Sequence, residues 1–405
     1  MRPVIVDRAA LHLERRGRFF GYALLAPYGL LLTMLLIFPI ATFLTRAVDN
    51  RPTADSLPRT AEVLSQWQSP ATVPDLAYKA LIQDVAVIGG RDKVASLGRR
   101  LNYDLNGLRS MIIKLAARPF GDGRDARAEL IALDPRWGDV EVWATLKQET
   151  GQLTASFILS AVDMEQATDG SIINKHTDQS IFRFSLWTTL SISLSVTAIC
   201  LVIGFPVAHF LTTVPPKRLG IFMIFVLLPF WTSLLVRTSA WIVLLQREGP
   251  VNTLLQWTGL IGAPLALLHN RTGVLIVMVH VLLPFMILSI YACMVAIPRD
   301  YVRAARSLGG GPVKIFWRIY LPQTYPGIGA GCLLVFILAL GYYVTPLLVG
   351  GPRDQMISSY VAFYTNQTIN WGLASALGLV LILIAAISYA VITRLTRTRG
   401  PLDTA

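Results

Sequence analysis

Six apolar segments dominate the pattern of hydrophobic and polar positions along this chain. They cover, approximately, residues 19–45, 184–212, 219–246, 272–297, 326–349 and 371–393. Each is long enough to cross a hydrocarbon core about 30 Å thick, which takes about 20 helical residues. Residues 46–180 are polar and contain 16 Lys and Arg against 18 Asp and Glu. The pattern predicts an all-α integral membrane protein with six transmembrane helices and a large insertion, 46–180, between the first two.

The first apolar segment has one feature of a signal peptide, because the basic sequence ERRGR precedes it. The apolar core of a signal peptide has roughly 7–15 residues and is followed by small residues at a cleavage site. Residues 19–45 are about twice that length, and no convincing cleavage site follows. We therefore expect an uncleaved anchor helix.

Composition supports a membrane location. The 405 residues are 54% hydrophobic and 15% charged, whereas roughly 25% of a soluble domain is charged. The net charge of +12 could attract nucleic acid, but the basic residues gather at the ends of the apolar segments. Membrane topology explains that placement, and we expect contact with lipid and no nucleic-acid partner. Cys200, Cys293 and Cys332 lie within apolar segments without metal-ligand spacing, so no metal site is expected.

Lys and Arg in short loops set the orientation of a membrane protein. One set of alternate loops contains fifteen of them and the other set contains three. The fifteen lie in 1–18, the sequence PPKR, 298–325 and the residues after 393, and the three are Arg247, Arg271 and Arg353. The count places both termini in the cytoplasm, including the N-terminal segment 1–18 and the tail 398–405. The insertion then lies on the extracytoplasmic, periplasmic side.

The basic segment 299–320 is expected to form two short amphipathic helices on the cytoplasmic side. The first has an apolar face at helical spacing, made by Tyr301, Ala304, Ala305 and Leu308. Three glycines at 309–311 then permit a sharp turn, and Pro312 suits the first turn of a second helix. The second apolar face is made by Val313, Phe316, Trp317 and Tyr320. Such an element could lie on anionic lipid or dock on a soluble partner.

The spacing A-A-x3-G-x9-I-x-L-P within this segment resembles the cytoplasmic coupling loop of binding-protein-dependent ABC importer permeases. The matching residues are Ala304, Ala305, Gly309, Ile319, Leu321 and Pro322. The family usually has a glutamate before the two alanines, where this chain has Arg303, and that difference leaves open any ionic contact the glutamate would make. The resemblance implies a short helix inserted into a cleft of an ATPase subunit, which transmits nucleotide-driven closure to the membrane helices.

A second stretch, LLPFWTSLLVRTSAWIVLLQREGPVN at 227–252, is similar to the third-helix region of spermidine/putrescine-type permeases, a subgroup that also serves opines. With the first helix, the resemblance covers 19–45 and 181–397. It implies the type I ABC importer permease fold, with 181–397 as the permease core. It also implies a non-catalytic subunit in the cytoplasmic (inner) membrane, which moves a small polar solute such as a polyamine or opine into the cytoplasm.

The same resemblance implies the partners. An extracytoplasmic binding protein would deliver the solute, and a dimer of separate ATPase subunits would bind and hydrolyse ATP, so no cofactor is expected in this chain. Because the chain has one coupling loop, a second permease is needed, and a homologous one would make a heterodimer. The resemblance assigns no role to the insertion. Helical periodicity over 75–118 suggests a folded unit, either a docking platform for the binding protein or a spacer.

Ionisable residues within membrane segments are costly and are candidates for function. Arg237 lies about halfway along the third apolar segment. It could line the translocation cavity or pair with carbonyls and hydroxyls. His280 and Trp231 are weaker candidates, since His280 suits a hydrogen-bonded packing role and Trp231 an interfacial aromatic belt. The six segments contain no Asp or Glu that would attract a polyamine.

Catalysis finds no support in the sequence. The chain has no G-x-x-x-x-G-K-[ST] phosphate loop, H-E-x-x-H or G-x-S-x-G motif. The alternative to a transport subunit is a membrane sensor or scaffold that signals through residues 299–322. A sensor would normally carry a cytoplasmic effector domain, and only about a dozen residues follow residue 393.

Overall fold

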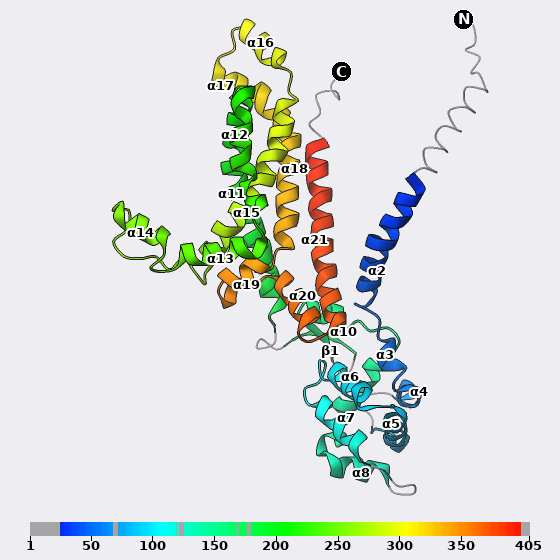
Figure 1. The fold of residues 1–405 in the computed structure, drawn as a ribbon. Helices are drawn as coiled ribbons and strands as arrows, with labels where there is room; N and C mark the ends of the chain where they lie inside the picture. The colour runs from blue at the N-terminus through cyan, green and yellow to red at the C-terminus, as the bar shows by residue number, and fades with distance from the viewer. Residues whose placement is uncertain are drawn as a thin grey trace, which may run out of the picture.

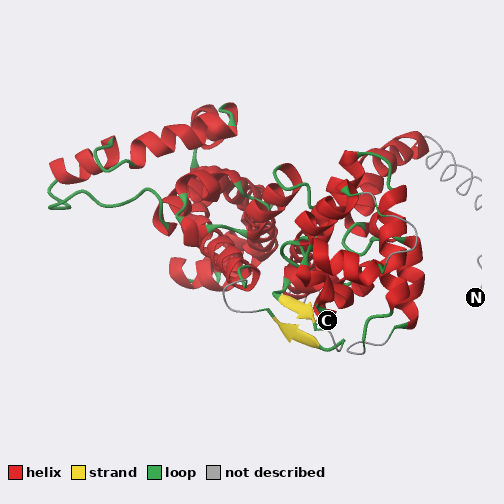
Figure 2. Cartoon of the chain, turned by 90° about the horizontal axis from the view of Figure 1, so that it is seen from below, coloured by secondary structure: helices red, strands yellow, loops and turns green. Residues whose placement is uncertain are grey.

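The computed structural model describes residues 25–67, 72–118, 120, 125–167, 170–175 and 180–397. The expected N-terminal segment, the first residues of the first apolar segment and the tail 398–405 lie outside the described residues. Helices make up most of the described chain (Figures 1 and 2). Its strands form one antiparallel pair, β1 (Met164–Gln166) and β2 (Ile172–Asn174).

Three long helices form the centre of the membrane part. They are α11 (Phe182–Thr213), α15 (Arg271–Val295) and α18 (Leu321–Leu340), and each packs on the other two. Glycines bring α15 and α18 together. A Cβ on Gly327 would lie 2.4 Å from the Cβ of Cys293, and one on Gly331 would lie 2.8 Å from the Sδ of Met286. Small residues let membrane helices approach closely and gain dispersion contacts where lipid supplies no hydrophobic driving force.

Several predicted spans coincide with helices. The segments predicted at 184–212, 272–297 and 371–393 correspond within a few residues to α11, α15 and α21 (Trp371–Arg397). The first span is helical over Leu25–Thr45. It contains a π-helical turn, η1 (Thr33–Ile37), followed by α2 (Phe38–Thr45). By length and composition, five helices of the described chain suffice to cross a membrane.

The third predicted span, 219–246, is broken, so the prediction of one continuous helix there is wrong. The chain forms α12 (Pro216–Leu227), the 3-10 turn η4 (Leu228–Trp231), α13 (Leu234–Leu245) and α14 (Pro250–Trp257). The direction changes by 97° between Trp231 and Leu234. Pro229 has no N–H to continue the helix, and Ser233 caps α13 by accepting a hydrogen bond from the Val236 N–H at 3.2 Å. A sixth crossing exists if this bent pair counts as one span.

The fifth predicted span, 326–349, is displaced along the chain. Its helix is continuous from Pro312 to Leu340 and ends before the sequence Gly-Tyr-Tyr. The residues expected at its end form a separate short helix, α19 (Val344–Val349). After it come the 3-10 turn η6 (Pro352–Asp354) and α20 (Ile357–Asn366), which packs on α21.

Residues between the first span and α11 fold into a helical unit with a hydrophobic core of its own, hereafter the insertion. Its elements are α3 (Arg51–Ala54), α4 (Pro58–Gln66), α5 (Asp75–Val87), α6 (Arg91–Leu101), α7 (Leu108–Ala117), α8 (Ala126–Leu133), η2 (Pro135–Gly138), α9 (Val140–Glu149) and α10 (Ser156–Ala161). Tyr78, Trp137 and Trp143 are buried in its core. The Tyr78 hydroxyl and the Trp143 indole N–H both donate to the Trp137 carbonyl, at 3.1 and 2.9 Å.

The insertion is attached to the membrane helices through α10. Phe157 of α10 packs so closely on Gly372, at the start of α21, that a Cβ there would lie 2.4 Å from its ring. The guanidinium of Arg100 also lies over the Phe157 ring, 4.2 Å from its centroid. Only glycine fits at position 372 without moving the phenylalanine.

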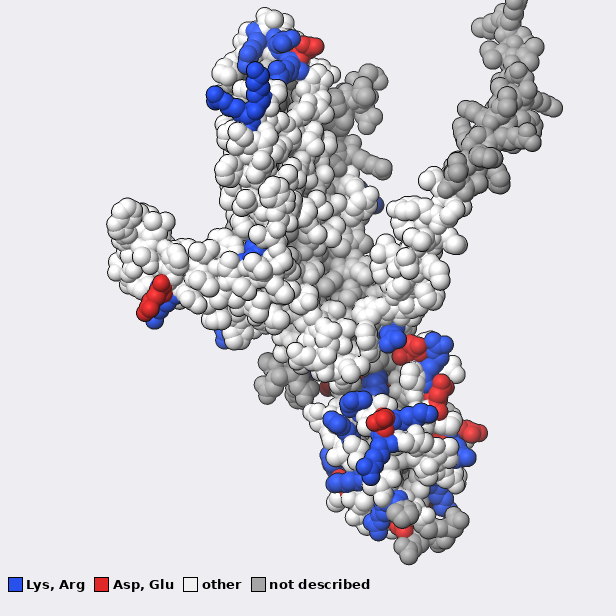
Figure 3. Space-filling view, viewed as in Figure 1, with Lys and Arg blue, Asp and Glu red and all other residues white. Residues whose placement is uncertain are grey.

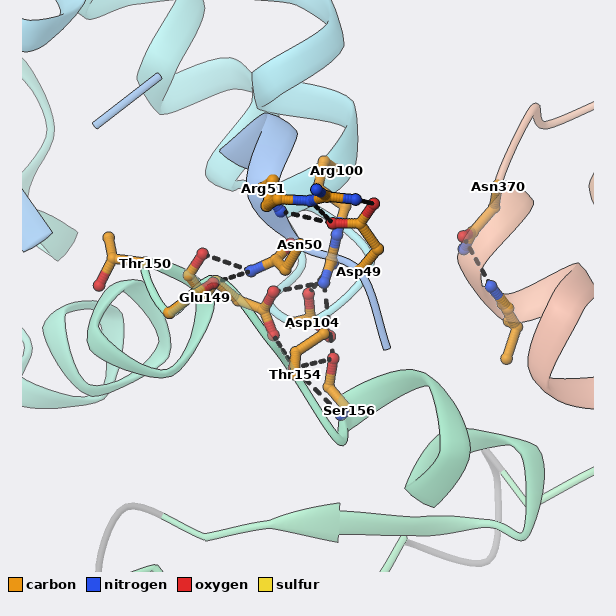
Figure 4. A network of polar contacts seen from close by, with 12 residues as sticks. Asp49, Asn50, Arg51, Arg100, Asp104, Glu149, Thr150, Thr154, Ser156 and Asn370 are labelled. Carbon is orange, nitrogen blue, oxygen red and sulfur yellow. Dashed lines mark hydrogen bonds and ion pairs between the residues drawn. The ribbon is translucent and has the colours of Figure 1, made fainter. Parts of the chain in front are cut away.

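A partly buried ionic network supports this joint from the insertion side (Figure 4). Arg100 donates to the carboxylates of Asp104 and Glu149. Thr154 donates to Glu149 at 3.4 Å and to the Ser156 hydroxyl at 3.0 Å. Burial, reinforced by the neighbouring Asp104 carboxylate, raises the pKa of Glu149 to about 7. One arginine therefore stabilises two carboxylates that repel each other.

Charged side chains divide the surface into zones (Figure 3). They gather over α16 and α17 at one end of the molecule and over the insertion at the other. On this face the surface between them is mostly uncharged, apart from one charged group on the lobe formed by α13 and α14 and a few isolated basic side chains. That apolar zone covers the membrane helices, whose exposed side chains include many large hydrophobic residues. The division fits a protein that spans a bilayer and presents its insertion and its basic loop on opposite sides.

Candidate coupling loop and translocation residues

The expected turn after the first short helix lies at Gly309. Helix α16 (Arg299–Ser307) ends there, and Gly309 has φ +78°, in the left-handed region that glycine adopts without strain. The N–H of Gly310 donates to the Ala305 carbonyl at 3.0 Å, and the N–H of Leu308 to the Ala304 carbonyl at 3.1 Å. These bonds close the end of α16 with a glycine cap.

The turn folds α16 back onto the next helix, α17 (Pro312–Ile315). Ala305 is 9% exposed and Ile315 is 5% exposed, and a Cβ on Gly310 would lie 3.1 Å from Ile315. Four other apolar side chains of the loop are uncovered. Tyr301, Leu308, Val313 and Trp317 are between 56% and 88% exposed. The loop therefore presents an uncovered surface of apolar side chains among basic ones.

Arg303, which stands where the resembling family has a glutamate, is exposed and pairs with the exposed Asp300, with 3.3 Å between Nη1 and Oδ1. Both side chains are mostly in solvent, so this pair contributes little to stability. The guanidinium remains available to a partner.

The sequence predicted a second short helix in the loop. The structure has no separate helix there. From α17 the chain continues through a π-helical turn, η5 (Phe316–Tyr320), directly into α18. Ile319, Leu321 and Pro322 of the coupling-loop pattern lie in this continuous stretch. Pro322 has no backbone N–H and cannot donate to the carbonyl one turn earlier. The N–H of Leu321 donates to the carbonyl of Phe316, five residues earlier, as in a π-helix. A rotation of the loop would therefore be carried into α18.

Aromatic side chains of the π turn also contact α11, a contact that sequence reasoning missed. Tyr320 lies 5.2 Å from the His209 ring centroid, and its hydroxyl is 3.2 Å from the His209 Nδ1. Phe316 packs edge-on against Phe205, with centroids 6.2 Å apart. The one signal in the sequence was a polar histidine near the end of an apolar segment. The cluster connects the coupling loop to a second membrane helix.

Arg237 lies in the first turn of α13, just after the bend, and not in the middle of a straight span. Its guanidinium donates to the Thr232 carbonyl at 2.9 Å, to the Thr232 hydroxyl at 3.2 Å and to the Pro229 carbonyl. The side chain is half-buried. It thus supplies donors to carbonyls that the break in the helix leaves without helical partners.

The two weaker candidates lie near the same bend. The indole N–H of Trp241 in α13 donates to the Nδ1 of His280 in α15 at 3.1 Å, which ties the bent segment to the central bundle. Trp231, the last residue of η4, is 74% exposed. The structure thus brings Arg237 and His280 to the contact between α13 and α15, and leaves Trp231 on the surface.

Named relatives match the second half of the chain. The spermidine/putrescine transport system permease protein PotB of Haemophilus influenzae is 36% identical over 202 residues, which are 50% of this chain and 71% of that protein. PotB of Escherichia coli is 32% identical over 209 residues, 52% of this chain and 76% of that protein.

Among solved structures, a bacterial ABC transporter involved in the import of the acidic polysaccharide alginate matches 54% of this chain and 79% of its own, at 20% identity. The TM-score of 0.42 is low. Residues 180–399, from the start of α11 to the end of α21, match the family described as "Binding-protein-dependent transport system inner membrane component". Because this match covers more than half of the chain, the protein belongs to that family.

Proposed function

We propose that this chain is the permease subunit of an ATP-binding-cassette importer, and that residues 303–322 are its ATPase-coupling loop. The observation that carries the proposal is the loop itself, an exposed helix-turn-helix that is rigidly continuous with a membrane helix and linked by aromatic side chains to another. Hydrolysis of ATP would be performed by a separate dimer of ATPase subunits. The chain itself would perform no chemistry.

The mechanism follows from these contacts. An ATPase cleft would receive the exposed face of α16, on which Tyr301 and Leu308 are uncovered. Closure of the two ATPases would move this helix, and the packing of Ala305 on Ile315 would carry the movement to α17 and α18. The contact between Tyr320 and His209 would move the end of α11 with it. Burial of the apolar face on the partner would drive the docking.

A second permease subunit is part of the proposal, because one coupling loop engages one ATPase and an importer contains two. We propose a homologous second subunit, and thus a heterodimer. An extracytoplasmic solute-binding protein would deliver the solute, and the insertion is large enough to serve as its docking platform.

The proposed solute is small and polar, such as a polyamine or an opine. The relatives named as spermidine/putrescine permeases support this class. The predicted membrane segments contain no carboxylate, and Arg237 would repel a cation, so the affinity for a polyamine would reside in the binding protein. The path through this chain would be only weakly selective. The sensor alternative is not favoured, since the named relatives are transport permeases.

The proposed location is the inner membrane, with the coupling loop in the cytoplasm and the insertion on the other side. The fifteen-to-three distribution of basic residues in short loops supports this orientation. The charged zones at opposite ends of the molecule fit it as well (Figure 3).

The orientation predicts which residues a membrane-impermeant thiol reagent reaches. In a variant without the three native cysteines, Ser65→Cys on the insertion is expected to react in intact cells, while Lys217→Cys before α12 reacts only after the membrane is permeabilised. Both positions are exposed in the structure. Reaction of both cysteines from outside would refute the orientation.

The coupling loop predicts a difference between two glycines that are two residues apart. Valine at position 309 would be forced into a left-handed conformation, which costs about 1–2 kcal/mol. Valine at 311 would have φ −71° and open space around its Cβ. We therefore expect Gly309→Val to weaken capture of the ATPase and to reduce uptake, with Gly311→Val close to wild type.

The measurement is a pull-down of the ATPase by each variant, with solute uptake in parallel and membrane insertion as the control. Wild-type capture and uptake by Gly309→Val would remove the docking role from this loop. It would then favour an element that lies on the lipid surface.

Arg237 predicts a transport defect without loss of assembly. Arg237→Leu removes the donors to the Pro229 and Thr232 carbonyls, and hydrogen bonds from charged groups contribute about 1.5–3 kcal/mol each. We expect uptake to fall about tenfold while the ATPase is still captured. Arg237→Lys keeps the positive charge but lacks the planar guanidinium that donates to two residues at once. Its uptake is expected to lie between that of Arg237→Leu and that of the wild type. Equal loss of the assembled complex would assign Arg237 to packing alone, and unchanged uptake would discard both roles.

A further inference from the structure

A cavity of about 410 Å³ lies where the insertion meets the ends of the first and last membrane helices. Its walls come from the start of α3, from α6, from Arg46 just after α2 and from residues 368–372 before and at the start of α21. Phe157 and Trp371 supply aromatic surface. Tyr103 of the insertion connects the two parts directly, because its hydroxyl donates to the Thr368 carbonyl before α21 at 2.9 Å. The site is thus shared between the insertion and the permease part.

The cavity holds more positive charge than the protein neutralises. Arg46 and Arg99 line it and are exposed, and neither has a carboxylate within ion-pair distance among the described residues. The Arg46 guanidinium instead lies 5.2 Å from the centroid of the Trp371 ring. The other charges at the site are already paired, since Arg100 binds Asp104 and Glu149, and Asp49 binds Arg51 at 2.9 Å. Arg46 and Arg99 are therefore left to attract an anion, and the four arginines of the group outnumber its three carboxylates.

An unpartnered donor lies in the same wall. Asn370 is 3% exposed, and its Oδ1 accepts from the Leu373 N–H at 3.1 Å, but its Nδ2 has no partner. A buried polar group without a hydrogen bond is costly, so native structures seldom keep one without a reason. Ile369 before it has φ +57°, an uncommon conformation for a β-branched residue. Asn370, Asp49 and Arg100 all line the cavity, and Figure 4 shows Asn370 on the opposite side of the view from the other two.

The membrane end of the cavity is apolar. Near it, α2 and α21 touch through Phe43 and Trp371, with ring centroids 6.3 Å apart, and the Ser375 hydroxyl donates to the Phe43 carbonyl at 2.6 Å. Further from the insertion the two helices diverge (Figure 1). Both leave large apolar side chains exposed there, Phe38 on α2 and Leu383 on α21 among them. Acyl chains that run along these helices would lead directly to the two arginines.

We propose that this cavity binds the phosphate group of an anionic membrane phospholipid, held by Arg46, Arg99 and the Asn370 amide, with its acyl chains along α2 and α21. A basic pocket at the membrane end of two helices suits such a headgroup, and the uncompensated charge favours a net-negative lipid over a zwitterionic one. The bound lipid would bridge α6 of the insertion to the start of α21. It would thereby fix the insertion relative to the membrane helices.

The test measures phospholipid binding to the assembled, purified transporter by native mass spectrometry. Phosphatidylglycerol is titrated against phosphatidylcholine. The wild type is expected to bind phosphatidylglycerol about tenfold more tightly. Both lipids carry the same phosphate, but the two arginines would repel the quaternary ammonium of phosphatidylcholine. Equal affinity for the two lipids would overturn the proposal.

Two substitutions, Arg99→Gln and Asn370→Asp, and one matched control locate the site. Arg99→Gln removes one unpaired cation, and Arg91→Gln at the other end of α6, outside the cavity wall, removes the same charge as a matched control. Asn370→Asp keeps the oxygen that accepts from Leu373 and places a negative oxygen where the unpartnered amide stood. We expect about tenfold weaker phosphatidylglycerol binding for Arg99→Gln and Asn370→Asp, and wild-type binding for Arg91→Gln.

Thermal unfolding without added lipid separates binding from folding. Asn370→Asp is expected to unfold at the wild-type temperature there, because Asp is as good a helix N-cap as Asn, and to lose the stabilisation that phosphatidylglycerol gives the wild type. Undiminished lipid binding by both Arg99→Gln and Asn370→Asp would overturn the site.

A last experiment replaces the lipid with glycerol 3-phosphate, which has the same phosphate chemistry without acyl chains. Equal stabilisation by this soluble ester would overturn the assignment to lipid.

Discussion

Coupling between the basic loop and the membrane part depends on one unbroken helix, which runs from Pro312 in the loop to Leu340 deep in the bundle. The helix continues through the π turn without a break in the chain of helical residues, so under the proposed function a force on the loop would reach the centre of the bundle along one helix. The glycine contacts of α18 with α15 keep that helix against its neighbour. The aromatic contacts of the π turn connect it to α11 as well. Under the proposed function, a short surface element would thereby act on the whole bundle.

The insertion is joined to this bundle by contacts of a different kind. Phe157 fits against Gly372, Arg100 covers the ring, and the carboxylates of the buried Glu149 and of Asp104 hold Arg100 in place. The joint is therefore part apolar and part ionic, and it lies at the first turn of α21. A protein that docks on the insertion would act on the start of the last membrane helix, at the opposite end of the molecule from the coupling loop (Figure 1).

The sequence predicted those features that depend on local pattern. Long apolar runs with polar ends placed α11, α15 and α21, and a glycine run before a proline placed a sharp turn within 309–311, where the structure has Gly309 in the left-handed conformation. An apolar segment does not show whether its helix is straight. The bend after Trp231 was therefore not predicted, although Pro229 lies in the segment 219–246. The amphipathic face of the second loop helix did not reveal that the helix continues into the membrane. Contacts between distant segments leave little local signature: the contact of Phe157 with Gly372 left none, and that of His209 with Tyr320 left only a histidine within an apolar segment.

The central claim is that the second half of the coupling loop and α18 move as one rigid body. It is tested most directly by pulsed electron paramagnetic resonance on the assembled transporter, with spin labels at Val313 and Leu334, both exposed in the structure. Rigid coupling predicts the same distance between the labels in the nucleotide-free transporter and in one trapped with a non-hydrolysable ATP analogue. A change in that distance on trapping would show that the π turn bends and absorbs the movement, and would contradict the claim.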